Sequence, residues 1–391
     1  AGALFFWDSD ATRSVWGILF LMSLIFPIEI ITTHHFVWLQ AHHSWRRMRL
    51  LLLFGAVRGA AGSIALASMG AGVIALALGN LLFSMPLLVD YVIRRPYTLR
   101  YRPLSFRDYI DGRRFGLNRM ASASLTSGSN LTEHWILSAM FGFATLGIYT
   151  RSVGLAQITS GRIGPVVMQS LYPVLTRAEA GSDRFRRFAG ILYQGVLWTS
   201  APAALFLALE ASQLVTLLYG NKWLDVIPLM GAAAVLLALR GLHLTLNQIL
   251  LANLQQKICL RIDIAASISM YGVIFTALAF GPFIFIWALA GHAALILIGT
   301  TYVAIQFCAL DASKLIRNTS TCLGALLIAT FVMFLVSLNF HPEGATVSIA
   351  GLVLRFMLFS FVYVVALRLL SPKGLFELLD ALPLPSRLEA A

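Results

Sequence analysis

The sequence is poor in charged residues. Asp, Glu, Lys and Arg make up 12% of the 391 residues, and 59% of the residues are hydrophobic, whereas a soluble domain has about 25% charged residues. This shortage excludes an ordinary soluble fold, and the repeated apolar runs are long enough to cross a bilayer as helices. The alternating segments of about ten residues that are typical of membrane β-barrels are missing. We therefore predict an all-α integral membrane protein.

Signatures of catalysis and of metal binding are also missing. The sequence contains no GxGxxG, P-loop, HExxH or nucleophile-elbow motif, and these motifs mark the common nucleotide, metal and acyl-transfer sites. The longest loop on the predicted outer side, residues 210–226, is too short for a catalytic domain. We expect a protein that is not an enzyme, with no catalytic residue, no metal and no cofactor, and with H⁺ or Na⁺ as the candidate coupling ion.

Cysteine is scarce, and histidine is clustered in one place. Neither metal-ligand spacing nor obvious pairing relates the three cysteines, so we expect free thiols; they are Cys259, Cys308 and Cys322. One HH-x6-HH pattern stands near Trp38, whereas membrane oxidases carry several such clusters. We interpret the pattern as an interfacial loop in water rather than a metal site; its members are His34, His35, His42 and His43.

Eleven apolar segments are predicted to cross the membrane. They are residues 14–32, 50–69, 73–92, 114–139, 145–170, 188–209, 227–251, 258–279, 283–307, 320–339 and 346–369. Between them, one set of alternate loops and the tail hold 21 Lys and Arg residues, and the opposite set holds two. Because cytoplasmic loops collect Lys and Arg, this split predicts a cytoplasmic C-terminus. It also accounts for the net charge of +12 without a nucleic-acid partner.

The stretch from 93 to 162 combines many arginines with polar positions in predicted spans. Residues 93–114 contain seven arginines. The following span carries polar residues at spacings of 3, 4, 4 and 3, which place them on one face of a helix; they are Arg119, Ser122, Thr126, Asn130 and Glu133. Charged side chains within a bilayer are costly and usually mark a substrate path. We expect this face to line a cavity.

Arginines outnumber acids inside the predicted spans. The arginines are Arg58, Arg119, Arg151, Arg162, Arg240 and Arg355, and the acids are Glu29, Glu133 and Asp263. A positive cavity suits an anionic substrate, such as a diphosphate-linked lipid head group or an acidic sugar. We predict that Arg119, Arg151 and Arg240 line it. The alternative is that each arginine snorkels or pairs with a carbonyl or an acid, which we favour for Arg355.

Four further positions are candidates for binding substrate or a coupling ion. Glycines and alanines beside Arg58 would let another helix approach it closely. His243 and Asn247 continue the polar face that begins at Arg240, at spacings of 3 and 4, and we expect this face to meet the lumen. Glu29 follows Pro27, which can bend the helix. Its carboxylate would bind H⁺ or Na⁺, or would instead pair with an arginine.

Four phrases connect these features to a known family. They are FGLNRMASASLTSGSN, LGIYTRSVGLAQI, LYPVLTR and LYGNKWLDVIPLM. Together they resemble the polysaccharide-transporter (Wzx-like) branch of the multidrug/oligosaccharidyl-lipid/polysaccharide flippase superfamily. The resemblance implies two six-helix lobes and two extra C-terminal helices. The chain is similar to helices four to fourteen, and we expect three helices to precede it. An odd number is also what the loop charges require if Ala1 lies outside.

The resemblance implies a division of the chain and a function. The parts are a partial N-terminal lobe (1–92), an arginine-rich cytoplasmic linker (93–113), a C-terminal lobe (114–307), two extra helices (308–370) and a cytoplasmic tail (371–391). The implied function is flipping of an undecaprenyl-diphosphate-linked oligosaccharide across the bacterial inner membrane by alternating access. Arg119, Arg151 and Arg240 would hold the head group, and Asn130 and Asn247 would bond sugar hydroxyls.

Partners and alternatives follow from the same reading. The expected partners are the anionic lipid-linked oligosaccharide, membrane lipids and polysaccharide polymerase or assembly proteins. A drug/cation antiporter of the same superfamily is the first alternative, but it would need an acid-rich lumen. A membrane glycosyltransferase or polymerase is the second, but it would need acids or histidines on a large outer loop.

Overall fold

The computed structural model describes residues 10–381 except 43, 73, 95–105, 159–160, 163, 165–166, 169–174, 176–177 and 340–348. Within these residues the regular structure is entirely helical, and nine helices are long and apolar enough to cross a membrane. The prediction of an all-α membrane fold is confirmed. The chain forms two compact units, residues 1–104 and 105–391, and each is described by itself.

The described residues of unit 1 form three helices. They are α1 (Asp10–Ala41), α2 (Trp45–Ser68) and α3 (Ile74–Arg94). Helix α1 continues to Ala41, well past its predicted end at 32, and contains Pro27. Glycines allow α2 and α3 to pack closely: a Cβ added at Gly59 would lie 3.0 Å from the Gly79 carbonyl oxygen and 3.3 Å from the Phe83 Cβ. The expected close approach beside Arg58 is confirmed, although the Arg58 side chain itself is exposed.

Substitution of Gly59 tests this packing. Gly59→Leu is expected to lower the free energy of unfolding by about 1–3 kcal/mol, because the added side chain forces the two backbones apart. The measurement is thermal unfolding of the purified chain in detergent. Ala60→Leu is the matched control, since Ala60 is exposed on the same helix. Equal melting temperatures for the two variants would contradict the close α2–α3 contact.

Unit 2 begins with the long helix α4 (Phe106–Ile158). Its 53 residues would extend about 80 Å if they were straight, at 1.5 Å per residue, which is far more than a bilayer requires. Gly142 breaks the helix with φ 83° and ψ 165°, a conformation open to glycine because it lacks a Cβ. The predicted spans 114–139 and 145–170 thus begin in the two arms of α4. Much of the second span after residue 158 lies outside the described residues.

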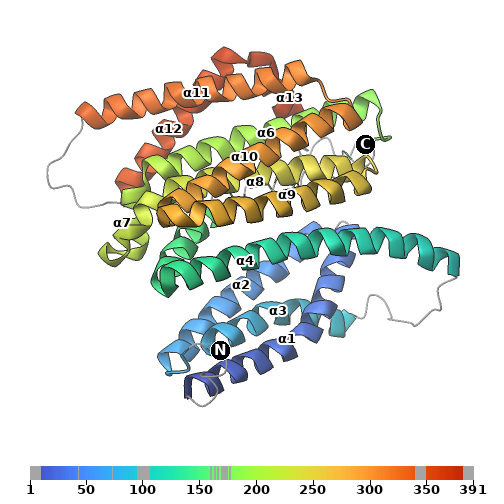
Figure 1. The fold of residues 1–391 in the computed structure, drawn as a ribbon, viewed down its shortest axis with the longest axis vertical. Coiled ribbons are helices and arrows are strands. Elements are labelled where there is room, and N and C mark those ends of the chain that lie inside the picture. The colour runs from blue at the N-terminus through green and yellow to red at the C-terminus, as the bar shows by residue number, and fades with distance from the viewer. Residues whose placement is uncertain are drawn as a thin grey trace. The chain divides into compact units, whose positions relative to one another are not determined.

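The rest of unit 2 surrounds a buried central helix. The elements are α6 (Asp183–Leu209), α7 (Ala211–Tyr219), η2 (Asn221–Val226), α8 (Ile227–Ala252), α9 (Gln256–Ala277), η3 (Leu278–Phe280), α10 (Gly281–Cys308), α11 (Ala312–Asn339), α12 (Ile349–Leu370) and α13 (Pro372–Ala381). Helix α8 packs against α4, α6 and α10, and Figure 1 shows α6, α8, α9 and α10 side by side. Small residues such as Ala232, Ala233 and Ala234, all fully buried, permit this dense packing.

Two predicted loops differ in the structure. Residues 210–226, expected to be the longest outer loop, are mostly helical, because α7 and η2 occupy them. In the predicted linker 93–113, residues 95–105 lie outside the described residues, and α4 already begins at Phe106. The boundary between the two units, after Leu104, falls within this stretch.

Polar contacts join the last three helices to the rest of unit 2. Gln194 on α6 donates from Nε2 to the Gly374 carbonyl of α13 (3.1 Å), and its Oε1 accepts from Asn318 Nδ2 on α11 (2.9 Å). Arg355 on α12 pairs with the buried Glu210 (3.3 Å), which matches the expectation of an internal acid partner. The short helix α13 occupies the first part of the predicted cytoplasmic tail (371–391); residues 382–391 lie outside the described residues.

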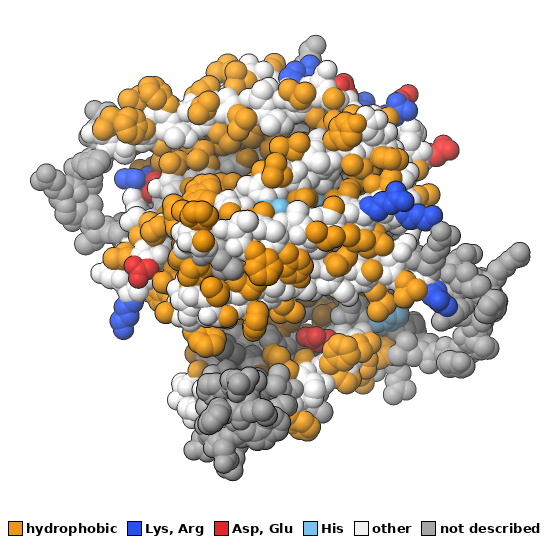
Figure 2. Space-filling model, viewed as in Figure 1, with side chains coloured by type: hydrophobic (Ala, Val, Ile, Leu, Met, Phe, Trp, Pro, Cys, Tyr) orange, Lys and Arg blue, Asp and Glu red, His pale blue; other side chains and the backbone are white. Residues whose placement is uncertain are grey.

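The exposed surface agrees with a lipid environment. Figure 2 shows apolar side chains across the visible face, with most Lys and Arg near its edges. Exposed large hydrophobic residues are frequent on α9, α11 and α12. The three cysteines are buried and free, as expected.

Candidate functional site

The predicted polar face of α4 divides into an exposed and a buried part. The side chains of Arg119, Thr126 and Asn130 are exposed, whereas Ser122 and Glu133 are 4% and 2% exposed. Ser122 and Glu133 point into unit 2, where partners from other helices reach them. The polar face of α4 therefore lies at the edge of the surface that packs against the other helices of unit 2, and only part of this polar face is exposed.

Glu133 is the centre of a buried ion pair. Arg240 on α8 approaches Glu133 Oε2 with Nη2 at 3.0 Å, and Tyr149 on the second arm of α4 donates its hydroxyl to Oε1. The Arg240 side chain is 31% exposed. Arg240 was predicted to act as a lumen cation, but the structure pairs it with an internal carboxylate. A carboxylate that loses its hydration on burial requires a charged partner. Through Arg240 and Tyr149, Glu133 joins α8 to both arms of α4.

A second buried carboxylate belongs to Asp263 on α9. Its partner on α8, Asn247, lies nearer the C-terminal end of that helix than Arg240, the partner of Glu133. Ser122 donates to Asp263 Oδ2, and Asn247 Nδ2 donates to Oδ1 at 3.3 Å. Arg119 is near enough for an electrostatic interaction with Asp263. Asn247 was predicted to bond sugar hydroxyls, but it is only 6% exposed and faces Asp263. Its Oδ1 has no hydrogen-bond partner among the described residues.

A small hollow opens beside this carboxylate. Its lining combines apolar and polar side chains, including an arginine; the residues are Asn118, Arg119, Ser122, Leu251, Gln256 and Cys259. The hollow brings the exposed Arg119 close to the buried polar cluster. A polar group of a ligand could reach Arg119 here without entering the packed core.

His243 also has an internal partner. Its Nδ1 lies 3.0 Å from Thr300 Oγ1 on α10, and the side chain is half-buried. Nearby, His292 Nε2 lies 2.8 Å from Ser269 Oγ. This contact gives His243 a structural role between α8 and α10, as an alternative to the predicted role at the lumen.

Arg151 is held differently from the other predicted lumen arginines. Its guanidinium carbon lies 5.7 Å from the centroid of the Tyr219 ring and 5.4 Å from that of Trp223. Both distances are within the range of cation–π interactions. The two rings belong to α7 and η2, in the segment that was expected to be a loop. Arg151 is exposed and forms no ion pair with a carboxylate of the described residues. The rings orient the guanidinium and leave its N–H groups available.

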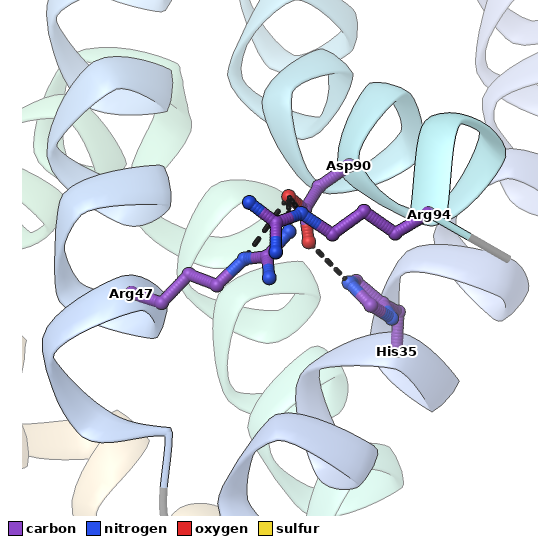
Figure 3. A network of polar contacts seen from close by, with 4 residues as sticks. All are labelled: His35, Arg47, Asp90 and Arg94. Carbon is purple, nitrogen blue, oxygen red and sulfur yellow. Dashed lines mark hydrogen bonds and ion pairs between the residues drawn. The ribbon is translucent and has the colours of Figure 1, made fainter. Parts of the chain in front are cut away.

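Unit 1 contains a polar cluster around Asp90 on α3 (Figure 3). His35 Nε2 on α1 lies 2.8 Å from Asp90 Oδ2. Arg47 at the start of α2 donates to Oδ1 from Nε (3.1 Å) and from Nη2, and Arg94 Nε lies 3.9 Å from the same oxygen. The carboxylate thus joins all three helices of unit 1.

The prediction that the histidine pattern forms a loop is wrong for its first two members. His34 and His35 belong to α1, because the helix continues through the predicted loop to Ala41. His35 is 1% exposed, His34 and His42 are exposed, and His43 lies outside the described residues. Asp90 is not among the residues predicted from the sequence. The sequence feature that indicates it is an acid four residues before Arg94 in an otherwise apolar segment.

The remaining candidates in unit 1 are exposed. Glu29 forms no ion pair within the described part of the chain, so the predicted pairing with an arginine is not seen there. Arg58 is exposed on α2. Among the described residues, no group of three or more His, Cys, Asp and Glu is arranged to hold a metal ion.

Comparison with known proteins gives consistent relatives. A family model described as "Polysaccharide biosynthesis protein" matches residues 11–228, more than half of the chain. A Klebsiella pneumoniae "uncharacterized membrane protein in cps region" is 24% identical over 140 residues, which are 36% of this chain and 29% of the relative. The lipopolysaccharide biosynthesis protein WzxC of Escherichia coli (strain K12) is 23% identical over 167 residues, 42% of this chain and 34% of the relative.

The fold has a known counterpart as well. A structure of the lipid II flippase MurJ in an inward closed conformation superposes with a TM-score of 0.67 at 12% identity, covering 93% of this chain and 75% of that chain. The matched stretches span about a third of the length of the two curated relatives. With its helical membrane fold and the match over more than half of its length, the chain belongs to the polysaccharide biosynthesis protein family.

Proposed function

We propose that the protein moves a lipid-linked saccharide with an anionic head group across a membrane and is a transporter rather than an enzyme. The observation that carries this proposal is the exposure of Arg119 and Arg151 on the two arms of α4. Neither arginine forms an ion pair with a described carboxylate, whereas Arg240 and Arg355 do. An exposed guanidinium on an apolar helical bundle is costly unless it serves a ligand.

The relatives support the same class of cargo. One is named for lipopolysaccharide biosynthesis, and a structure with the same fold is that of a lipid II flippase. Guanidinium groups bind phosphates through two parallel hydrogen bonds, so Arg119 and Arg151 each suit a phosphate of an anionic head group. We infer that the cargo is an undecaprenyl-diphosphate-linked oligosaccharide and that Asn130, exposed on the polar face of α4, bonds its sugar hydroxyls.

The mechanism and location follow the same proposal. Alternating access of the two lobes would expose the arginines to each side in turn. The Lys and Arg distribution supports a cytoplasmic C-terminus in a bacterial inner membrane. A polysaccharide polymerase would then receive the cargo on the other side.

Export in cells tests the proposed function. The gene would be deleted and replaced by the full-length gene on a plasmid, and surface polysaccharide and lipid-linked intermediates would be measured. We expect deletion to abolish surface polymer and to accumulate the lipid-linked unit, and the plasmid to reverse both effects. Unchanged surface polymer after deletion, together with a gain of sensitivity to cationic dyes, would refute the proposal in favour of a drug antiporter.

A further inference from the structure

We propose that unit 2 contains two separate phosphate-binding sites, one at Arg119 and one at Arg151, and that the anionic head group of the cargo occupies them in succession. The two-site arrangement rests on the proposed function, which supplies the head group. Both arginines are exposed on α4. They lie near opposite ends of α8, so one head group cannot contact both at once.

The buried helix α8 measures the separation of the two arginines. Trp223, whose ring centroid lies 5.4 Å from the Arg151 guanidinium carbon, belongs to η2, which directly precedes α8. Leu251, which lines the hollow together with Arg119, lies in the last turn of α8. The 26 residues of α8 extend about 39 Å at 1.5 Å per residue, which is more than the hydrocarbon core of a bilayer, about 30 Å. A single diphosphate is far too short to join the two arginines.

The Arg119 site combines a cation with two amides. The residues that line the hollow are Asn118, Arg119, Ser122, Leu251, Gln256 and Cys259. None of these six is an acid, and the side chains of Asn118 and Gln256 form no hydrogen bond within the described part of the chain. Guanidinium and amide N–H groups are donors. A phosphate in the hollow would therefore meet one charged donor group and two neutral ones.

The nearby carboxylate of Asp263 leaves Arg119 available. Asp263 is 7% exposed, and its oxygens accept hydrogen bonds from Ser122 and from Asn247 Nδ2, the latter at 3.3 Å. Arg119 interacts electrostatically with Asp263 but forms no ion pair with it or with another described carboxylate. The buried acid thus holds the guanidinium beside the hollow without occupying its N–H groups.

The Arg151 site is built from aromatic rings instead of amides. Tyr219 and Trp223 both lie at cation–π distance from the guanidinium. The neighbouring Ser152 donates its hydroxyl to the Val226 carbonyl at 3.4 Å, which holds this part of α4 beside the start of α8. Rings that stack on a guanidinium face leave its N–H groups at the edge free for a phosphate.

The charges of the loops give the order in which a head group meets the two sites. Lys257 and Arg261 are exposed at the start of α9, next to Gln256 of the hollow, and this end of unit 2 is predicted to be cytoplasmic. The Arg151 site adjoins the segment 210–226, which is predicted to lie outside. A head group that enters from the cytoplasm would bind first at Arg119 and then at Arg151.

Counting bound lipid on the purified chain tests whether the sites are separate. Native mass spectrometry would count the molecules of undecaprenyl diphosphate bound per chain in detergent, with undecaprenol, which lacks phosphate, as the control lipid. We expect two molecules for the wild type, one for Arg119→Gln, one for Arg151→Gln and none for the double variant, because side chains so far apart act independently. Arg187→Gln, the matched control on α6, should bind two.

The counts separate the two-site arrangement from the proposed function. A single bound molecule on the wild type, weakened by both substitutions, would show one shared site and overturn the arrangement while the proposed function stands. Binding of undecaprenyl diphosphate no better than that of undecaprenol would refute the proposed function itself. Equal filling of both sites by phosphatidylglycerol would assign them to bulk membrane lipid and would also overturn the arrangement.

The order of the two sites has its own measurement. Each variant would be purified from the deletion strain, and the lipid-linked saccharide that co-purifies would be measured per chain. Arg151→Gln should retain at least as much as the wild type, because its cargo binds at Arg119 and cannot move on. Arg119→Gln should retain about 10-fold less, through loss of a charged hydrogen bond. Equal or reversed amounts would overturn this order.

Discussion

Replacement of Glu133 by alanine is expected to lower the free energy of unfolding by about 2–4 kcal/mol. The substitution leaves Arg240 without its carboxylate 3.0 Å away and deprives the Tyr149 hydroxyl of its acceptor. An uncompensated charge within the bundle is then the main penalty. The value lies below that of a fully enclosed ion pair, because the protein leaves 31% of the Arg240 side chain uncovered.

Unfolding of the purified chain by denaturant in mixed micelles would measure this loss. Glu179→Ala is the control, since Glu179 is exposed in the same unit. The double variant Glu133→Leu with Arg240→Met should be more stable than Glu133→Ala, because it removes both charges and refills the space. A Glu133→Ala variant as stable as Glu179→Ala would show that the pair contributes nothing to unit 2.

Loss of Arg151 is expected to have the largest effect on transport. Arg151→Gln should reduce export by about 10- to 100-fold, as a charged hydrogen bond to phosphate contributes roughly 1.5–3 kcal/mol. Arg151→Lys should recover only part of the rate, because an ammonium group neither stacks on Tyr219 and Trp223 nor binds phosphate in two places. Trp223→Ala should give an intermediate loss, since one of the two rings that orient the guanidinium is removed.

The measurement is surface polymer per copy of membrane-inserted protein in the deletion strain. Arg187→Gln is the matched control, because Arg187 is exposed on α6 without a described ion pair. Stability in detergent should be unchanged for Arg151→Gln, which separates a binding role from a structural one. Normal export by this variant would remove Arg151 from the proposed binding site.

Hydropathy located the helices well because the bilayer requires a minimum length of apolar helix. The predicted span 227–251 and the observed α8, Ile227–Ala252, differ by one residue. Errors arose where polar residues belong to helices. Helix α1 continues past residue 32 through His34 and His35, since the half-buried carboxylate of Asp90 on α3 contacts the polar His35 ring. Sequence windows contain no information on such a partner.

The polar groups of the candidate site could be predicted from the sequence, but their burial could not. Periodicity identified a polar face on α4, yet it could not separate the exposed Arg119 and Asn130 from the buried Ser122 and Glu133. Residues that share a helix face differ in burial when a neighbouring helix covers only its edge. The aromatic neighbours of Arg151 were hidden for a related reason: Tyr219 and Trp223 are more than sixty residues further along the chain and lie in a segment expected to be a loop.

The sequence by itself determined that the chain is a helical membrane protein, where most of its helices lie and which residues carry charge among them. These properties depend on composition and on local spacing, which a single segment contains. Only the tertiary structure decided which charges are neutralised: Arg240 by Glu133, Arg355 by Glu210, and Asp90 by Arg47 with His35. Each of these contacts joins different helices, and a charge in an apolar bundle is stable only with such a partner. Packing left Arg119 and Arg151 exposed on α4 without a described carboxylate partner, so both remain open to a ligand.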